Sequence, residues 1–279
     1  MKFSLSSYKK ALFIAIAVLL IIPQSLFAQS EKPKNLLLYD TQPYHFGFII
    51  GLNQMSYAIN FKDNYQFIGH ESTEYPSTAD TYYYEGATYY VHSITPIFEP
   101  GFTVGVVGNL RLGKYFDLRL IPSLSFGSRT IEYDFYRRLP ESDKDQMAYH
   151  TKKKSIFSTF VEFPLQVKCK SKRYNNVAAY VIAGGNFKID LASQKKSQVD
   201  VQNAQGETVT VTDNIRVKRV DIAAEIGTGF DFYTHFFKFG IEAKMSFGLL
   251  NVMNSQGLIY DSSIDGLHNR MFQVSLTFE

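Results

Sequence analysis

The stretch VGVVGNLRLGKYFDLRLIP, residues 104–122, decides the fold. On both sides of a short break at Gly113–Tyr115, apolar residues recur at every second position, and polar or charged residues lie between them. A period of two is typical of a β-strand whose two faces meet different surroundings. The stretch therefore predicts two strands of a hairpin, with Arg111, Asp117 and Arg119 on one face.

The same alternation recurs along the chain in segments of about ten residues, the strand length of an outer-membrane barrel. These segments predict eight strands, at residues 45–53, 102–112, 116–126, 157–168, 177–189, 220–232, 237–247 and 271–279. In seven of them the apolar and polar faces are distinct. The segment 177–189 is apolar on both faces, so the sequence does not decide which face points inward.

The connections between these segments alternate in length. The long connections are 60–96, 135–154, 190–217 and 251–268, and the short ones are centred on 113–115, 171–176 and 234–235. Outer-membrane barrels have long outer loops and short periplasmic turns. The sequence therefore predicts an all-β, eight-stranded antiparallel transmembrane outer-membrane β-barrel over residues 45–279. Both termini would be periplasmic, and the loop 190–217 would form an extracellular hairpin around Gly206.

The N-terminus has the features of an export signal. A basic start and the apolar run 11–22 precede a small residue, Ala28, which is suited to cleavage. A membrane anchor helix is the alternative, but the run is short of the ~20 residues that span a bilayer, and Pro23 interrupts it. We expect 1–28 to be a signal peptide for the Sec pathway and 29–44 to be a periplasmic segment.

Charge and cysteine content exclude some functions. The chain has 29 Lys and Arg against 26 Asp and Glu, but three of the lysines and none of the acidic residues lie in residues 1–28. The remaining chain is therefore balanced, and its charge does not indicate binding to nucleic acid. Cys169 is the single cysteine, so no internal disulfide can form.

The polar face of the strands predicts a lumen charge network. In a small membrane barrel the apolar face meets lipid and the polar face meets the lumen, which side chains fill. Buried charges must pair, and a selective pore would instead have a ring of one sign, so the near balance of five basic and six acidic residues predicts a plug. The expected members are Arg111, Asp117, Arg119, Glu162, Lys168, Asp221, Glu225, Asp231, Lys238, Glu242 and Lys244. Arg129 is expected outside the barrel.

A soluble periplasmic β-sandwich would show the same alternation, since one face of each of its strands meets water. Large side chains occupy the apolar face nearly everywhere, and the charges on the polar face are balanced. The chain also lacks the cysteine pair and the tryptophan of an immunoglobulin-like core. These features favour the barrel.

The sequence has no motif for catalysis or for a cofactor. Its six histidines show no metal-ligand spacing, and no GxSxG, P-loop or zinc signature occurs. We expect no metal, no cofactor and no enzymatic activity. An outer-membrane lipid hydrolase that pairs a serine with a loop histidine (His70, His92, His150 or His268) is the remaining enzymatic alternative.

The first long loop is rich in tyrosine. Five of these residues crowd into nine positions: Tyr82, Tyr83, Tyr84, Tyr89 and Tyr90. Tyrosine is stiff and amphipathic, which suits a surface that contacts other proteins. An aromatic girdle at the membrane interface, or an extension of the hairpin above it, would explain the same residues. Both interpretations stay open.

Three stretches resemble the PorT family of outer-membrane β-barrels, which is associated with the type IX (Por) secretion system. They are HFGFIIGLN at 45–53, FEPGFTVGVVGNLRLGKYFDLRLIPSLSFGSRTIEY at 98–133 and VEFPLQVKCKS at 161–171. The most specific residues are Pro100, Gly101, Phe102, Leu118, Arg119, Pro122, Ser125, Phe126, Gly127 and Arg129. The resemblance extends from about Pro43 to Phe278.

The resemblance implies a role in exporting cargo with C-terminal sorting domains, such as surface proteases or motility adhesins. It implies other type IX components in the outer membrane or periplasm as partners, together with outer-membrane lipid. It brings no catalytic motif. Because a plugged barrel is not a conduit for cargo, an accessory role is expected. A general structural or adhesin-like barrel is the alternative.

Overall fold

The computed structural model describes residues 33–71, 88–138, 148–192, 198–202, 208–212, 215–255 and 260–279. In this part of the chain, strands dominate, with two single-turn 3-10 helices, η2 (Tyr39–Thr41) and η3 (Tyr65–Phe67). No helix there is long and apolar enough to cross a membrane. The expected signal peptide, 1–28, lies outside the described residues, as do Tyr82, Tyr83 and Tyr84.

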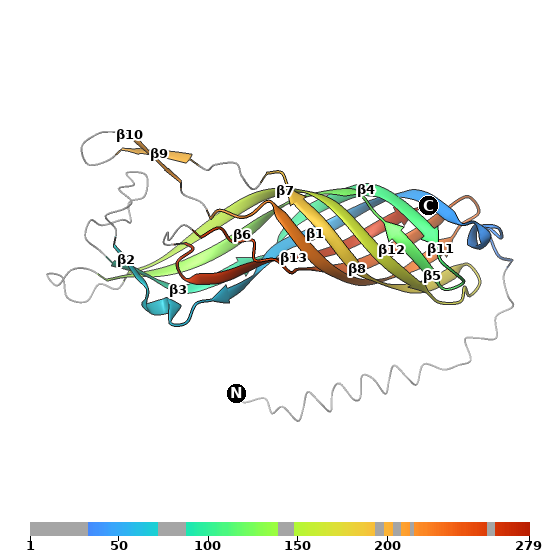
Figure 1. Cartoon of the computed structure of the whole chain (residues 1–279), viewed down its shortest axis with the longest axis horizontal. Helices are drawn as coiled ribbons and strands as arrows, with labels where there is room; N and C mark the ends of the chain where they lie inside the picture. The colour runs from blue at the N-terminus through green and yellow to red at the C-terminus, as the bar shows by residue number, and fades with distance from the viewer. Residues whose placement is uncertain are drawn as a thin grey trace, which may run out of the picture. The chain divides into compact units, whose positions relative to one another are not determined.

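Eleven of the strands form one sheet and two form a separate hairpin (Figure 1). The sheet contains β1 (Tyr44–Phe61), β2 (Gly69–Glu71), β3 (Thr88–Ile97), β4 (Glu99–Arg111), β5 (Phe116–Leu120), β6 (Ser123–Arg138), β7 (Ala148–Lys170), β8 (Val177–Asp190), β11 (Val220–Tyr233), β12 (Lys238–Gly248) and β13 (Ile264–Phe278). The hairpin pairs β9 (Gln198–Gln202) with β10 (Thr208–Thr212), so the hairpin expected in 190–217 is present.

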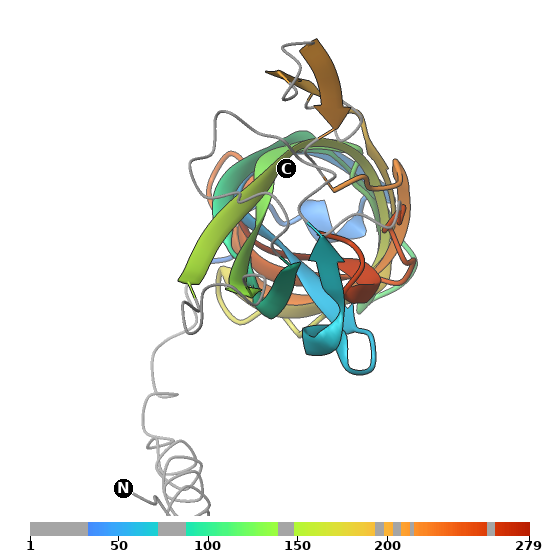
Figure 2. The ribbon, with the colours of Figure 1, turned by 90° about the vertical axis from the view of Figure 1, so that its left-hand side faces the viewer.

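The sheet closes on itself through antiparallel pairs (Figure 2). It runs β1-β13-β12-β11-β8-β7 and returns through β5, β6 and β4 to β1. Strands β5 and β6 occupy one place in this ring, because both pair with β4 on one side and with β7 on the other. They are separated at Pro122, which has no N–H to donate to the ladder. The ring therefore has eight places, as predicted.

Strands also occur where the sequence suggested loops, which corrects the predicted strand count. The segment 60–96 contains η3, β2 and most of β3, and the segment 135–154 contains the end of β6 and the start of β7. The segment 251–268 contains the start of β13. These additions lie at one end of the ring, which we name the loop end. The turn end is the opposite end, with the connections 112–115, 171–176 and 234–237 (Figure 1).

Side chains on the outside of the ring are large, apolar and exposed, which is the reverse of a water-soluble protein. On the outward face of β1, for example, Phe46 is 72% exposed and Leu52 is 74% exposed. Asn53, on the inward face of the same strand, is 2% exposed. The same outward exposure is found for Phe102, Val106, Leu120, Phe163, Leu165, Val181, Ile222, Ile226, Phe230, Ile241, Val274 and Leu276. This arrangement fits a lipid solvent and excludes the soluble sandwich.

Strand β6 passes from one environment into another. Its inward side chains are first polar, Ser123, Ser125 and Arg129, and then apolar, Ile131, Tyr133 and Phe135. Its outward side chains change in the opposite sense, from Leu124 and Phe126 to Ser128, Thr130 and Glu132. Because inward and outward faces alternate strictly along a strand, this double change marks the boundary of the apolar band near residues 126–130.

Beyond this boundary the loop end has the apolar core of an ordinary soluble protein. The buried side chains come from β1, β3, β6, β7, β13 and the neighbouring loops: Tyr57, Tyr89, Val91, Ile94, Ile131, Tyr133, Phe135, Ile156, Ile215, Val217, Val252, Met253, Tyr260, Ile264 and Leu267. We name this cluster the loop-end core. Since these side chains pack together across the ring, they close its loop end.

Candidate functional site: a charged lumen closed at both ends

The structure places ten of the eleven predicted lumen residues inside the ring, each at most 4% exposed. The exception is Arg111, the last residue of β4, which is only half-buried. Its Nε donates to the carbonyl of Gly113 at 3.1 Å and its Nη1 to the carbonyl of Thr41 at 3.3 Å. Arg111 therefore lies at the turn end, outside the ion pairs, and its assignment to the network is corrected.

Near the turn end the network joins β7, β11, β12 and the last residue of the chain. The Lys168 ammonium lies 2.7 Å from Asp231 Oδ2, and Lys238 lies 2.8 Å from Glu279 Oε2 and 4.0 Å from Asp231 Oδ2. Glu279 was not predicted. It continues the inward phase of Gln273, Ser275 and Thr277 on β13, so the alternation already pointed to it.

One ion pair spans the lumen. Arg119 on β5 donates from Nη1 to Glu242 Oε2 on β12 at 2.6 Å, and both side chains are fully buried. Tyr180 on β8 donates its hydroxyl to the same carboxylate oxygen at 3.0 Å. The ammonium of Lys168 lies over the Tyr180 ring, 3.7 Å from its centroid. These contacts connect opposite walls of the ring, so side chains cross the lumen at this level.

Toward the loop end a second cluster links β7, β8, β11 and β12. Lys244 lies 3.3 Å from Glu225, and Lys188 lies 3.5 Å from Glu162. Asn186 Nδ2 donates to both carboxylates, at 2.8 Å to Glu225 and 2.5 Å to Glu162. The amide of Asn186 therefore bridges two ion pairs, which makes them one hydrogen-bonded unit.

Arg129 was expected outside and is instead 2% exposed inside the ring. Its guanidinium lies 2.5 Å from Asp190 Oδ2 and donates to Asn269 Oδ1 at 2.5 Å. The rings of Tyr57 and Phe160 lie 4.8 and 4.9 Å from it. The prediction was wrong because it ended the strand at Phe126, whereas the inward phase of β6 continues without a break.

The segment 177–189, whose inward face the sequence did not decide, also contributes side chains to the lumen. Tyr180, Ile182, Asn186 and Lys188 point inward, and Val181 and Phe187 point outward. Six basic and seven acidic side chains of the described wall strands are thus buried: Arg119, Arg129, Lys168, Lys188, Lys238, Lys244, and Asp117, Glu162, Asp190, Asp221, Glu225, Asp231, Glu242. Removing each of these charges from water costs several kcal/mol, which ion pairs offset for all but Asp221. The Asp221 carboxylate instead accepts a hydrogen bond from Asn269 at 2.7 Å.

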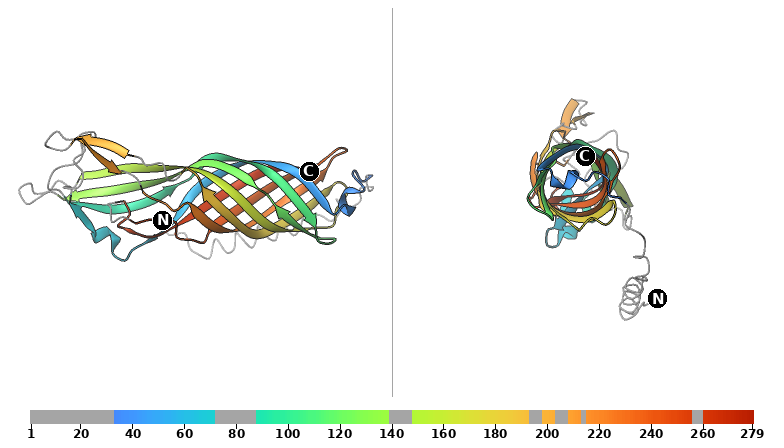
Figure 3. Two further views of the ribbon diagram at one scale, coloured as in Figure 1. Left: turned by 45° about the horizontal axis from the view of Figure 1, so that its top comes forward. Right: turned by 90° about the vertical axis from the view of Figure 1, so that its right-hand side faces the viewer.

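Residues 35–42, which we name the N-terminal strap, lie at the turn end (Figure 3). The backbone N–H of Asn35 donates to Asn176 Oδ1 at 2.9 Å, and its side-chain amide donates to the carbonyl of Tyr233 at 3.0 Å. Arg173 donates to the Asn35 carbonyl and stacks on Tyr233, 3.8 Å from the ring centroid. The Tyr233 hydroxyl donates to Asp40 at 3.1 Å.

Tyr39 fastens the middle of the strap. Its ring stacks on His45 with a centroid distance of 3.7 Å, and its hydroxyl donates to Glu279 Oε2 at 3.0 Å. Lys238 lies over the same ring at 4.9 Å. Burial, together with the neighbouring Glu279 carboxylate, raises the pKa of Tyr39 well above its ordinary value, so the hydroxyl stays protonated as a donor. The strap is therefore tied to the lumen network at the turn end.

The tyrosines of the first long loop do not act as a group in the described residues. Tyr89 is 4% exposed and belongs to the loop-end core, so its assignment to a loop contact is corrected. Tyr90 is half-buried and stacks on Tyr136 with a centroid distance of 5.1 Å. Both residues lie in β3, which matches the alternative of a strand extension above the membrane.

Of the four loop histidines, the structure describes the side chains of His92 and His268. His92 is exposed and meets the edge of the Tyr136 ring, and the neighbouring Ser93 hydroxyl donates to Asp134 at 2.6 Å. The side chains of His70 and His150 lie outside the described part. Hydrogen bonds from Ser93 and Thr151 lower the pKa of Asp134. Across the described residues, no group of three or more His, Cys, Asp or Glu side chains is placed to hold a metal.

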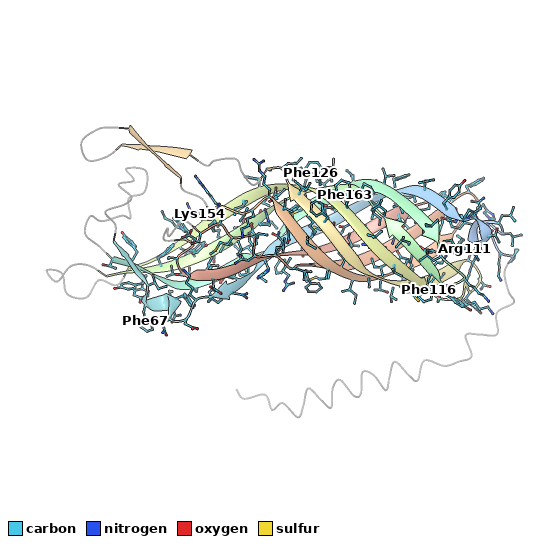
Figure 4. All side chains as sticks on the ribbon, in the orientation of Figure 1. Phe67, Arg111, Phe116, Phe126, Lys154 and Phe163 are labelled. Carbon is cyan, nitrogen blue, oxygen red and sulfur yellow. The ribbon has the colours of Figure 1, made fainter. Side chains whose placement is uncertain are left out.

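Figure 4 shows how these features divide along the ring, with Arg111 and Phe116 at the turn end and Phe67 and Lys154 at the loop end. A closed antiparallel ring with an apolar outside and paired charges inside defines a transmembrane β-barrel. The chain belongs to the outer membrane protein beta-barrel domain family, whose model matches residues 27–254. It is an outer-membrane β-barrel protein.

Solved structures matched by this chain include three bacterial proteins. The attachment invasion locus protein Ail of Yersinia pestis is 11% identical, with 85% of this chain and 98% of that chain covered and a TM-score of 0.31. The N-terminal β-barrel domain of Pseudomonas aeruginosa OprF is 12% identical, with 85% and 99% covered and a TM-score of 0.27. A Pseudomonas aeruginosa FadL homologue is 10% identical, with 85% and 90% covered and a TM-score of 0.25. Curated proteins gave no match.

Proposed function

We propose that this protein is a sealed, non-enzymatic barrel that acts as a structural and surface-presenting component of the outer membrane. The observation that carries the proposal is the ion pair between Arg119 and Glu242, which crosses the lumen with both side chains fully buried. An open channel would need water along its axis at this level. The barrel would therefore act through its two ends and not through its lumen.

Three successive barriers support a sealed lumen. The N-terminal strap lies at the turn end and is bonded to Glu279 through Tyr39. The charge network fills the middle of the ring, where eight strands leave just enough space for side chains. The loop-end core packs fifteen buried apolar side chains at the other end. A solute would have to displace all three to pass.

The orientation follows from the lengths of the connections. Short turns are typical of the periplasmic side of an outer-membrane barrel and long loops of the outer side. We propose that the turn end faces the periplasm, that residues 29–44 are periplasmic after a Sec signal peptide at 1–28 is removed, and that the loop end faces outward. The extension made by β3, β6 and β7 would then stand at the cell surface.

Conductance in a planar lipid bilayer tests the sealed barrel. The purified protein should give no steady conductance, because charged side chains occupy its lumen. Replacing both members of the spanning pair, in Arg119→Ala with Glu242→Ala, removes the bridge and should give small steps. Steps of equal size from the unaltered protein would overturn the proposal. Loss of surface binding on deletion of 190–217, with conductance still absent, would support surface presentation.

An accessory role in type IX secretion is the second candidate, and it rests on the resemblance of residues 98–133 to the PorT family. Two arginines of that run, Arg119 and Arg129, hold ion pairs inside the barrel. A sealed barrel would assist or assemble a larger translocon with other type IX components and would not carry cargo. The test is the secreted and surface proteome of a strain that lacks the gene, beside a complemented strain.

The two candidates give different proteomes. Periplasmic accumulation of proteins with C-terminal sorting domains, with other envelope proteins unchanged, would support the secretion role. An unchanged secretome would leave the structural and adhesin-like function and would end the secretion candidate.

A further inference from the structure

The N-terminal strap turns two leucines toward solvent. Leu37 is 71% exposed and Leu38 is 73% exposed, although the strap lies at the mouth of the barrel and is not part of its apolar wall. Phe236, on the turn between β11 and β12 at the same end, is 90% exposed. Large apolar side chains exposed to water at one end of a molecule are typical of an interaction surface.

The exposed leucines belong to a segment that is held in place on both sides. Asn35 is bonded to Asn176 and to Tyr233, and Tyr39 is bonded to Glu279 and stacked on His45. Between these anchors the chain turns through Leu36, whose φ of 49° lies in the left-handed region that side chains rarely adopt. Such conformations persist where surrounding contacts impose them, and they concentrate at functional sites.

The exposed charges of the turn end are mainly basic. Lys114 and Lys172 are exposed on two of the turns. Asp40 accepts a hydrogen bond from Tyr233 and lies 3.6 Å from Arg173, while Asp117 and Glu279 are buried in ion pairs. Asp40 is thus the partly exposed carboxylate among the described residues of this end, with 42% of its side chain exposed, and Tyr233 and Arg173 engage it. The two lysines therefore give the exposed surface around the apolar side chains a basic character.

We propose that Leu37 and Leu38, together with Phe236 and accompanied by Lys114 and Lys172, form a docking surface for a periplasmic protein segment with apolar side chains flanked by carboxylates. Apolar side chains at the centre would supply affinity, and the lysines would select an acidic partner. The strap lies at the barrel mouth, whereas lipid surrounds the wall, which favours a protein over a membrane surface. The inference rests on the proposed orientation and goes beyond the sealed barrel.

Site-specific photo-cross-linking in intact cells tests this docking surface. The photoreactive residue p-benzoyl-phenylalanine replaces Leu38, or replaces Phe67 as a control, because Phe67 is 76% exposed at the loop end. The cross-linked segment is then sequenced by mass spectrometry. We expect a protein adduct at position 38 alone, whose cross-linked segment has apolar residues beside Asp or Glu.

Variants test the chemistry of recognition. Lys114→Glu with Lys172→Glu places like charges opposite an acidic partner and should lower the adduct yield by about tenfold. Leu37→Ser should lower it as well. The side chains of all three residues are exposed, so the variants should keep the heat-modifiable migration of the folded barrel.

The proposal is overturned by an adduct to lipid alone, by a partner segment without acidic residues, by equal adducts at positions 38 and 67, or by a yield that charge reversal leaves unchanged. A membrane-impermeant thiol label on Leu38→Cys in intact cells, in a Cys169→Ser background, separates this failure from a failure of the orientation. Labelling would show that the turn end faces outward, which would overturn the orientation and the docking surface with it.

Discussion

Arg119 and Glu242 stand 2.6 Å apart across the lumen, and neither side chain reaches solvent. A buried pair of this kind gains little over a well-packed apolar pair, but removing one partner leaves the other charge without compensation. The same holds for Arg129 and Asp190, which lie where the polar lumen meets the loop-end core. At the scale of the residue, therefore, the stability of the barrel depends on every paired buried charge keeping its partner of opposite sign.

Replacing Arg119 by Leu tests this dependence. The buried Glu242 would lose its cation, and we expect the variant to lose about 3–5 kcal/mol of unfolding free energy. Unfolding by guanidinium in detergent, followed by heat-modifiable migration, measures the change. Arg129→Leu should behave similarly, because Arg129 is buried with Asp190.

Lys153→Leu is the matched control, because Lys153 is 63% exposed in its ion pair with Glu132. An exposed pair contributes at most about 1 kcal/mol, so this variant should unfold almost as the unaltered protein does. If Lys153→Leu and Arg119→Leu shifted the unfolding midpoint equally, the inside and outside assignment would be wrong.

A glycine on β11 makes room for a lumen side chain. A Cβ added at Gly229 would lie 2.5 Å from the Tyr180 hydroxyl and 2.5 Å from the carbonyl of Ile241. Gly229→Ala should therefore displace Tyr180 from Glu242 and cost about 1–3 kcal/mol, as overpacking does. Gly185→Ala is the control, since its nearest atom would be 3.9 Å away. Equal unfolding midpoints in guanidinium for the two variants would contradict this account.

Strand β6 shows at the scale of the element how one segment serves two solvents. Its inward face changes from Ser125 and Arg129 to Tyr133 and Phe135, and its outward face changes in the opposite sense. The inward and outward positions were predictable where only the outward face is apolar, because the alternating polar residues must then point inward. It was not predictable above residue 130, where the polarity of the two faces is exchanged.

Other differences have the same physical origin. Tyr89 in β3 was placed in a loop because the apolar residues there face inward, unlike those of the membrane strands. The segment 177–189 was ambiguous because Ile182 points into a lumen that is otherwise polar. Contacts across the lumen, such as the one between Arg119 and Glu242, form only when the ring closes. A local sequence pattern does not show which residues of distant strands then face each other.

The strap lies at the turn end, where we propose that it closes the lumen, and Tyr39 is its central anchor. Tyr39→Ala would remove the hydrogen bond to Glu279 and the stack on His45, so the strap should lift from the mouth. A cysteine at Thr277, which is 1% exposed on β13, reports on this opening. In a Cys169→Ser background, a small thiol reagent should modify this cysteine faster when Tyr39 is replaced by Ala. A fall of about 1.4 kcal/mol in the free energy of opening the strap would raise the modification rate about tenfold.

Tyr44→Ala is the control for the strap, because Tyr44 is 61% exposed on the outside of β1. It should leave the modification rate of the cysteine unchanged. A rate that stayed the same in Tyr39→Ala would show that Tyr39 does not hold the mouth closed.

At the scale of the whole molecule, two cores of opposite polarity share the same strands. The membrane part is held by backbone pairing around a closed ring and by ion pairs within it, and its outside is solvated by lipid. The loop-end core buries apolar side chains as a water-soluble domain does. Because the two parts are stabilised by different interactions, a substitution that destabilises one part need not unfold the other.

Tyr133→Ala tests this independence. Tyr133 is fully buried in the loop-end core and donates its hydroxyl to the carbonyl of Tyr260 at 2.9 Å. Its truncation should cost the loop end about 3–5 kcal/mol, as large-to-small aromatic substitutions in cores do. Cleavage by trypsin after Lys153 should accelerate, while heat-modifiable migration of the barrel stays normal. Tyr136→Ala, at a half-buried position stacked on Tyr90, should accelerate cleavage far less. If Tyr133→Ala instead abolished heat-modifiable migration, the two cores would form one cooperative unit, and the lumen charges and the apolar cap would have to assemble together.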